Sequence, residues 1–349
     1  MGLIVTDALN QTLKATSRSF YLTMRVLPCA IRPQISLAYL LARATDTIAD
    51  TEIISVKRRL EALEKLRARI LGTSQAGLNF GELASPQANP AEKILLERSE
   101  EALALLNRFS PEDQKHIRDV LNTITSGQEL DLQRFAGANE HLVIALQDES
   151  ELDDYTYRVA GCVGEFWTRM CRTHLFPGAK LNDALLMANG IRFGKGLQLV
   201  NILRDLPRDL RMGRCYIPQD ELNFAGLMPH DLLAMANEEK FRPVYEKFLD
   251  QAQRHLAAGW AYTKSLPRNQ PRVRLACAWP ILIGARTLQK LRSENILDAS
   301  RRVKVGRAEI RNLIAKSILL YPFSSKWDLQ FTEAVDFRNA VDSKSSFHY

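Results

Sequence analysis

The sequence lacks the features that mark several common classes of protein. Its five cysteines are an odd number, lie far apart and include no Cys-x-x-Cys pair, which excludes a zinc knuckle and a disulfide framework. The six histidines are scattered, and none forms a His-x-x-x-His ligand pair. No apolar run approaches the ~20 residues of a membrane-spanning helix, because the longest one, residues 275–285, contains Pro280 and is flanked by arginines.

The first residues do not form the apolar stretch of a secretory signal. We therefore predict a cytoplasmic protein with reduced thiols, and peripheral contact with a membrane surface stays open as an alternative. The formal net charge of +7 and the pI near 9.2 suit an anionic substrate or a membrane surface without choosing between them. Because the basic residues are dispersed and match no nucleic-acid motif, we predict no nucleic-acid partner, and we predict no protein partner.

Strand patterns are also scarce, since no segment sustains an alternation of apolar and polar residues. Apolar residues recur instead at helical spacing, which predicts an all-α protein with one helical domain over residues 1–325. A Gly- and Pro-containing surface loop is expected at about residues 72–90, and an irregular tail over 326–349. The helix expected over residues 56–71 carries six basic residues, Arg59 among them, that we assign to a solvated face. Helices are further expected over residues 34–52, 90–109, 111–135, 151–175, 184–206, 271–295 and 307–320, and two more within 231–266.

Two of the expected helices carry a pair of aspartates four residues apart: Asp46 with Asp50, and Asp205 with Asp209. This spacing places each pair on one helix face, where like charges repel by a few tenths of a kcal/mol unless a counter-ion is present. A chance pair on a solvated face is the alternative, but both segments are mostly apolar. Paired carboxylates suit hard divalent cations that keep part of their water. Two such faces opposed to each other would hold a polyanion such as a diphosphate.

Pro207 interrupts the second of these segments. It lacks an N–H and clashes with the carbonyl of Leu203 four residues before it. The sequence therefore predicts a kink or a helix end between Asp205 and Asp209.

Two further segments combine residue types that suit a ligand site. Ser17, Arg18 and Ser19 bring two hydroxyls and a guanidinium together, which either cap a helix or grip phosphate oxygens. Residues 155–165 mix phenols with small residues, and Gly161 and Gly164 allow close approach of a helix or a ligand.

Taken in order, residues 17–20, 39–50, 155–164, 198–209 and 213–218 resemble motifs of the squalene/phytoene synthase family, the head-to-head prenyl transferases. The resemblance covers residues 16–316 and implies an all-α bundle of the isoprenoid-synthase type with a central cavity. It also implies magnesium and two prenyl diphosphate substrates. Arg208 stands where relatives often place another acid, which makes Asp209 a less secure ligand than Asp205.

The resemblance assigns roles to individual residues. Tyr155 would lie near the developing carbocation, and Asp46 and Asp205 would take part in catalysis. The implied metal ligands are Asp46, Asp50, Asn201, Asp205 and Asp209. The implied substrate-binding residues are Ser17, Ser19, Phe20, Tyr39, Arg43, Gln198 and Arg214. Ionising an allylic diphosphate requires such metals and arginines on the leaving group, together with an apolar pocket that excludes water.

The late region, residues 275–307, resembles that of squalene synthases. It predicts that two farnesyl diphosphates are joined through presqualene diphosphate and reduced by NADPH to squalene, a precursor of sterols, hopanoids or carotenoids. Lys304 and Arg307 would contact the NADPH phosphate, unless this is only a solvated basic stretch. No Gly-x-Gly-x-x-Gly follows a strand, so such a site would not be a Rossmann one. The alternatives are a dehydrosqualene-, phytoene- or presqualene-diphosphate-forming enzyme without reduction, and a non-catalytic lipid-binding helical protein.

Overall fold

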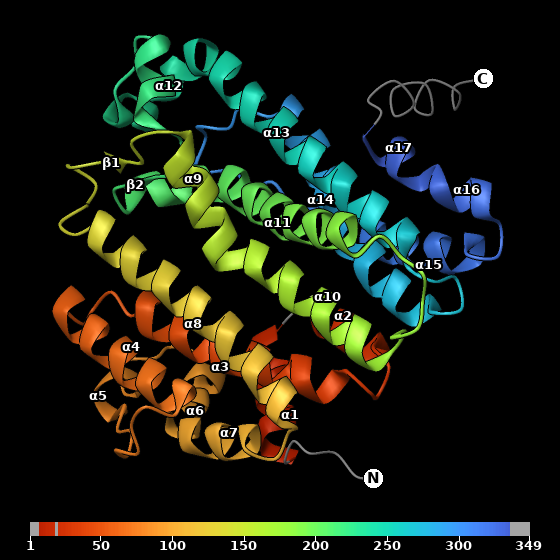
Figure 1. Cartoon of the computed structure of the whole chain (residues 1–349). Coiled ribbons are helices and arrows are strands. Elements are labelled where there is room, and N and C mark those ends of the chain that lie inside the picture. Colours follow the sequence, from red (N-terminus) through yellow and green to blue (C-terminus); the bar gives the residue numbers. More distant parts are fainter. Residues whose placement is uncertain (1–6, 18–19, 336–349) are drawn as a thin grey trace. The chain divides into compact units, whose positions relative to one another are not determined.

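The computed structural model describes residues 7–17 and 20–335, without the side chains of residues 7–10, 17 and 20–22. Regular structure in this part is almost entirely helical, which confirms the predicted all-α fold (Figure 1). Its strands, β1 (Ile144–Ala145) and β2 (Arg214–Cys215), are short and pair in parallel. No helix among these residues is both long and apolar enough to cross a membrane. Contacts divide the chain into two compact units that are interleaved in sequence, residues 1–136 with 158–180 and residues 137–157 with 181–349.

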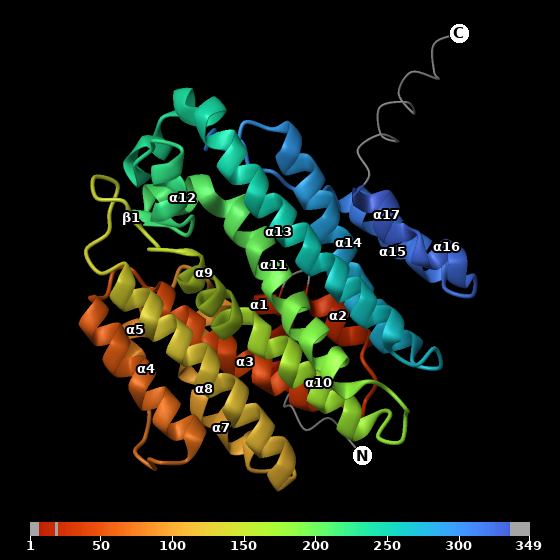
Figure 2. The ribbon, with the colours of Figure 1, turned by 45° about the horizontal axis from the view of Figure 1, so that its top comes forward.

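The first unit is built around α3, which packs against α4, α6, α7 and α8 (Figures 1 and 2). Pro33 occupies the first turn of α3, where its missing N–H costs no hydrogen bond. Leu37, Leu40 and Ile48 of this helix are fully buried, so α3 is fixed by apolar burial along its whole length. The helices of this unit are α1 (Asp7–Ser17), α2 (Phe20–Val26), α3 (Arg32–Asp50), α4 (Val56–Leu71), α5 (Gly81–Ala84), α6 (Pro90–Glu97), α7 (Ser99–Leu106), α8 (Pro111–Arg134) and α10 (Cys162–His174).

Three expectations for the first unit are corrected. The loop at 72–90 contains a short helix, α5, and the helix expected over 90–109 is two helices that meet at Arg98. At this break the Ser99 hydroxyl donates to the carbonyls of Leu95 and Leu96 and so competes with the helical pattern. Arg59 is not on a solvated face: it is buried, and it donates to the carbonyl of Ala49 at 2.6 Å at the C-terminal end of α3. An arginine in this position satisfies a terminal carbonyl and complements the helix dipole.

The second unit is built around three long helices, α11, α13 and α14, that pack side by side (Figures 1 and 2). Two glycines allow α11 and α13 to approach closely. A Cβ on Gly196 would lie 2.9 Å from the Cβ of His255, and one on Gly259 would lie 2.9 Å from the Phe193 ring. The helices of this unit are α9 (Glu149–Thr156), α11 (Asp183–Arg211), α12 (Gln219–Phe224), the 3-10 helices η2 (Pro229–Leu233) and η3 (Met235–Asn237), α13 (Glu238–Ser265), α14 (Pro271–Ser293), α15 (Arg307–Leu320), α16 (Ser324–Asp328) and α17 (Gln330–Val335).

The expected irregular tail is wrong for residues 326–335, which belong to α16 and α17. Trp327 of α16 is 2% exposed and stacks on Trp260 of α13, with ring centroids 4.7 Å apart. Its indole N–H donates to the carbonyl of Ser317, and that of Trp260 donates to the carbonyl of Asp328. Burial of two indoles with satisfied donors fixes a segment whose own sequence has little helical pattern.

The turn between α9 and α10 is a π-helical segment, η1 (Tyr157–Gly161). Such one-turn π segments are rare and occur often at functional sites. The chain passes from the second unit to the first within this turn.

Candidate active-site residues

The first acidic segment lies on α3 in the first unit. Arg43 forms an ion pair with Asp46 and a second one with Glu92 of α6, where Nη2 and Oε1 are 2.5 Å apart. The Tyr39 hydroxyl donates to the carbonyl of Thr16 at 3.2 Å and so ties α3 to α1. Asp50 is exposed at the end of the helix. Glu92 has no counterpart in the sequence prediction, because it lies 49 residues from its partner.

The electrostatics of this segment depend on one shared arginine. Burial raises the pKa of the Asp46 carboxyl, the Arg43 guanidinium opposes that shift, and Glu92 adds to it. The side chain of Asp46 is nevertheless 41% exposed, so it can still reach a ligand. Burial lowers the pKa of Arg43, but its two carboxylate partners outweigh this and raise it. Arg43 thus supplies the positive charge that offsets the crowding of acids on this face.

The second acidic segment lies on α11 in the second unit. Arg204 Nε is 3.0 Å and Nη2 is 2.5 Å from the two carboxylate oxygens of Asp205, and Arg302 Nη2 is 3.4 Å from one of them. Burial acts to raise the pKa of Asp205, but the hydrogen bonds and charges of the two arginines outweigh it, so the pKa lies below its ordinary value. Asp205 is therefore held ionised. Arg302 is not identified from the sequence, because there it is marked only by its place in a run of basic residues.

Pro207 does not end α11, which runs on to Arg211. A proline leaves the carbonyl four residues before it without an N–H partner, and here that carbonyl is Leu203. The hydroxyl of Tyr245 on α13 donates to it at 3.0 Å. Tyr245 is completely buried, and burial raises its pKa, so the hydroxyl stays protonated as a donor. Of the two predicted outcomes, a kink or a helix end, the helix end is wrong, and both aspartates of the second pair lie on one helix.

The remaining residues predicted on and after α11 lie close to this acidic pair in sequence. Gln198 is half-buried and Asn201 is exposed on α11. Asp209, also half-buried, lies close enough to Cys215 for its charge to add to the burial that raises the pKa of that thiol to about 12. Arg214 belongs to β2, which pairs with β1.

Tyr155 lies at the end of α9, just before the π-helical turn. Its ring stacks on that of Tyr216, with centroids 4.7 Å apart and planes inclined by 24°. Both phenols are nearly buried, so the Tyr155 ring is held in one position. Beyond the turn, Arg158 packs closely on α8: a Cβ on Gly127 would lie 2.8 Å from that of Arg158, whose Nη1 donates to the Ser126 hydroxyl at 2.9 Å.

Other predicted site residues are not engaged or not described. Lys304 and Arg307 are exposed, and their side chains have no hydrogen-bond or ion-pair partner among residues 7–17 and 20–335. Ser19 and the side chains of Ser17 and Phe20 lie outside the described residues, so the predicted phosphate-gripping role of that segment stays a prediction.

The acidic residues suit magnesium by their chemistry. All five predicted ligands offer carboxylate or amide oxygens, and the described side chains include no group of three or more His, Cys, Asp or Glu that could hold a metal ion. Magnesium is commonly held by one or two carboxylates together with substrate phosphates and water. A pair of aspartates on each helix therefore fits an ion that arrives with a diphosphate.

Known proteins share extended similarity with this chain. Residues 13–309 match the model of the squalene/phytoene synthase family. The presqualene diphosphate synthase of Zymomonas mobilis is 30% identical over 272 residues, which cover 77% of this chain and 80% of that protein. The bifunctional lycopene cyclase/phytoene synthase of Blakeslea trispora is 26% identical over 86% of this chain, but the match spans only 48% of the longer relative.

Solved structures show the same fold. The complex of TcSQS with the ligand E5700 superimposes with a TM-score of 0.74 at 22% identity, covering 97% of this chain and 95% of that one. A dehydrosqualene synthase in complex with a ligand gives a TM-score of 0.62 at 19% identity, covering 89% and 96%. The predicted isoprenoid-synthase fold is confirmed, and the chain belongs to the squalene/phytoene synthase family.

Proposed function

We propose that this protein condenses two farnesyl diphosphates head to head with the help of magnesium and releases presqualene diphosphate. The observation that carries the proposal is the repeated pairing of an acidic helix with arginines: Asp46 with Arg43 on α3, and Asp205 with Arg204 and Arg302 beside α11. Prenyl transferases of this family act on prenyl diphosphates. Binding such a substrate needs carboxylates to hold the metal and arginines to bind the phosphate oxygens.

Each group has a defined task in this reaction. When bound, magnesium would neutralise the diphosphate that leaves from one substrate. Arg43 and Arg204, already held beside the carboxylates, would bind phosphate oxygens as the C–O bond breaks. The aromatic face of Tyr155 would lie near the allylic cation. The double bond of the second substrate attacks this cation, and loss of one proton closes the cyclopropane.

The absence of a reductive step distinguishes this proposal from the expectation of squalene. Forming presqualene diphosphate releases one diphosphate and one proton and consumes no hydride. Two relatives that cover most of this chain, from Zymomonas mobilis and Rhodopseudomonas palustris, are presqualene diphosphate synthases, with 30% and 28% identity. These relatives favour the non-reductive alternative over the NADPH-dependent one.

The reaction is tested by incubating the purified protein with farnesyl diphosphate and magnesium, with and without NADPH. We expect presqualene diphosphate in both cases and no product after chelation of magnesium. Squalene formed only with NADPH would restore the reductive reaction. In that event Lys304→Gln with Arg307→Gln would test the predicted cofactor contacts, whereas presqualene diphosphate formation should not respond to this double change.

The acidic helices are tested by single substitutions. Asp46→Asn and Asp205→Asn should each lower the rate at least about a hundredfold, because several kcal/mol of leaving-group stabilisation depend on the metal. Asp119→Asn is the control, since its carboxylate is exposed and pairs with Lys115 on the surface of α8. No turnover in the parent protein, with retained binding of prenyl lipids, would favour the lipid-binding alternative.

A second candidate is phytoene formation from geranylgeranyl diphosphate. The matches to bifunctional lycopene cyclase/phytoene synthases support it. Conversion of geranylgeranyl diphosphate with farnesyl diphosphate left unused would assign this reaction instead.

A further inference from the structure

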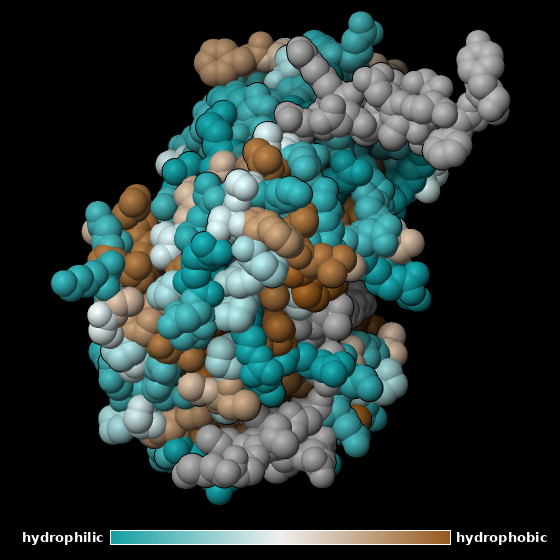
Figure 3. Space-filling model, turned by 90° about the vertical axis from the view of Figure 1, so that its right-hand side faces the viewer, coloured by the Kyte–Doolittle hydropathy of each residue, from teal (hydrophilic) through white to brown (hydrophobic). Residues whose placement is uncertain are grey.

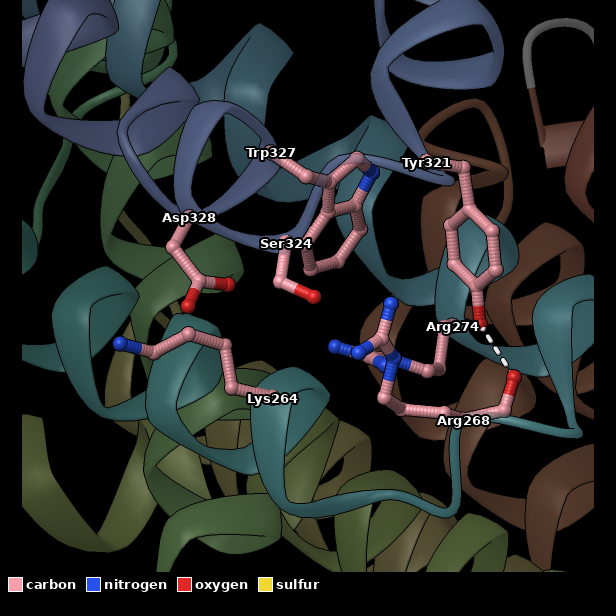
Figure 4. Close-up of a pocket in the computed structure, with 7 residues that line it drawn as sticks. All are labelled: Lys264, Arg268, Arg274, Tyr321, Ser324, Trp327 and Asp328. Carbon is pink, nitrogen blue, oxygen red and sulfur yellow. Dashed lines mark hydrogen bonds between the residues drawn. The ribbon is translucent and has the colours of Figure 1, made fainter.

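A small polar pocket lies in the second unit, at the end where α13 and α14 are joined. It has a volume of about 250 Å³. Figure 4 shows its side chains surrounding a common space: Ser324, Trp327 and Asp328 of α16 face Lys264 and Arg268, with Arg274 and Tyr321 beside them. This volume is below the roughly 300–1,000 Å³ of sites for drug-sized ligands, so the pocket suits a small group.

Arg274 is the central polar group of this pocket. It is 6% exposed, and its Nε has no hydrogen-bond partner among the described residues. Its guanidinium lies 4.7 Å from the ring centroid of Trp327 and 5.5 Å from that of Tyr321. The two rings hold the guanidinium plane but satisfy none of its donors strongly. A buried guanidinium with unused donors that lines a cavity is suited to an anion.

The charges around the pocket favour the same ligand. Lys264, Arg268 and Arg274 contribute three positive charges, and Asp328 contributes one negative charge. None of the three cationic side chains has an ion-pair partner within 4.0 Å in the described part of the chain. The excess of two positive charges matches a dianion.

The walls of the pocket are fixed before any ligand arrives. The Tyr321 hydroxyl donates to the carbonyl of Arg268 at 2.8 Å, which ties the α13–α14 turn to the end of α15. The indole of Trp327 donates to Ser317, a residue that also accepts a hydrogen bond from Trp279 of α14. A preorganised site loses less entropy when it binds.

The pocket is separate from the acidic segment of the same unit. Tyr245 of α13 contacts Leu203, two residues before Asp205. Lys264 lies about 28 Å farther along α13, at roughly 1.5 Å per residue. None of the residues that line the pocket was predicted to bind a prenyl diphosphate.

We propose that this pocket is a second anion site that binds a phosphate group, independent of the acidic helices. Arg274 supplies the buried donors, and Lys264 and Arg268 supply charge at the mouth. Large apolar side chains are also exposed nearby on α15 and on the segments around α16: Ile318, Leu319, Phe323 and Leu329. On the face drawn in Figure 3, apolar and hydrophilic side chains are interspersed. The phosphate group can therefore come from a free phosphate or from a phospholipid headgroup.

Calorimetric titration of the full-length protein with inorganic phosphate, without magnesium or prenyl substrate, tests the site. The pocket variant combines Lys264→Gln and Arg268→Gln. The matched control combines Arg272→Gln and Lys326→Gln, which removes the same charge from exposed residues of α14 and α16 that do not line the pocket. We expect Kd to rise about tenfold or more in the pocket variant, from the loss of charge-assisted contacts, and to stay within about twofold in the control. Equal changes in both variants, or no phosphate binding by the parent, would overturn the proposal.

Arg274→Gln tests the buried group directly, with circular dichroism to confirm folding. If it folds, it should lose phosphate binding while it retains presqualene diphosphate formation. If it does not fold, the pocket variant still decides the matter, because Lys264 and Arg268 are exposed. Failure of prenyl transfer in the parent would not bear on this site.

The source of the phosphate group is resolved by sedimentation with vesicles. Phosphatidylcholine vesicles that contain phosphatidate should bind the parent and the control but not the pocket variant if a headgroup is the ligand, and inorganic phosphate should compete. Equal vesicle binding by all three proteins, with phosphate binding still pocket-dependent, would support the site and assign it to a free phosphate.

Discussion

The contact between Tyr245 and Leu203 leads to a quantitative prediction about how α11 passes through a proline. Tyr245→Phe removes the hydroxyl that donates to the Leu203 carbonyl at 3.0 Å in a fully buried position. The Leu203 carbonyl then has neither a helical N–H, which Pro207 cannot supply, nor the tyrosine hydroxyl that replaces it. A buried unsatisfied group costs about 1–3 kcal/mol. We expect the free energy of unfolding to fall by that amount, although only one oxygen atom is removed.

Pro207→Ala supplies the second half of the experiment. Alanine restores an N–H that can donate to the Leu203 carbonyl, so the Tyr245 hydroxyl becomes partly redundant. In this background Tyr245→Phe should cost about 1 kcal/mol less than in the parent, which a double-mutant cycle measures as a coupling energy. Pro280→Ala, inside α14, is the matched control, because the carbonyl four residues before it is not the one that Tyr245 binds.

Urea unfolding of the six proteins (the parent, the three single variants, and Tyr245→Phe combined with Pro207→Ala or with Pro280→Ala) gives the required free energies when it is followed by circular dichroism and tryptophan fluorescence. Agreement of the two probes establishes the single transition on which the cycle depends. Additivity of Tyr245→Phe and Pro207→Ala within about 0.5 kcal/mol would refute the idea that the phenol replaces the missing N–H. So would an equal coupling in the Pro280→Ala control.

Three further results are expected. Glu309→Gln should lower the free energy of unfolding by up to about 1 kcal/mol at neutral pH. Burial acts to raise the pKa of Glu309, but Lys290 and Arg286 outweigh it and lower that pKa. The ionised carboxylate is therefore the stabilising form, and the loss should disappear in urea titrations as pH falls below about 4. Cys29 should be the first cysteine to react with iodoacetamide in the folded protein, as read by mass spectrometry, because it is exposed whereas burial raises the pKa of Cys215 to about 12; early modification of Cys215 would contradict this. Trp327→Ala should cost about 3–5 kcal/mol in calorimetry, and a cost below ~1 kcal/mol would show that α16 is not fixed by its indole.

Local sequence patterns were sufficient for most of the two helices that carry the acidic residues. The spacing of apolar residues predicts α3, and α11 as far as Leu206, because each buries a continuous face whatever its neighbours are. The same spacing fails for residues 326–335, whose helices depend on the stacking of Trp327 on Trp260. No local pattern contains that contact, since its stabilisation comes from another helix.

The contacts around the candidate site that the sequence does not predict share one property: each joins two residues that lie far apart along the chain. Arg302 is 97 residues from Asp205, Glu92 is 49 from Arg43, and Tyr245 is 42 from Leu203. Lys304 and Arg302 lie in the same basic run, and only the fold shows that Arg302 is the one that reaches Asp205. A prediction based on spacing finds residues that share an element, but not the partners that set their charge state.

The arginine partners of Asp46 and Asp205 influence how the candidate site is prepared for its substrate. Two carboxylates on one helix face repel, and an empty site must tolerate this before metal and diphosphate arrive. Arg43 offsets the repulsion on α3, and Arg204 and Arg302 offset it on α11. In the proposed reaction, these guanidiniums would exchange their aspartate partners for the diphosphate oxygens that arrive with the metal, while Arg43 keeps its ion pair with Glu92. If the proposed reaction is correct, the same arginines would stabilise the folded protein before the substrate binds and the leaving group during the reaction, with little reorganisation of either helix.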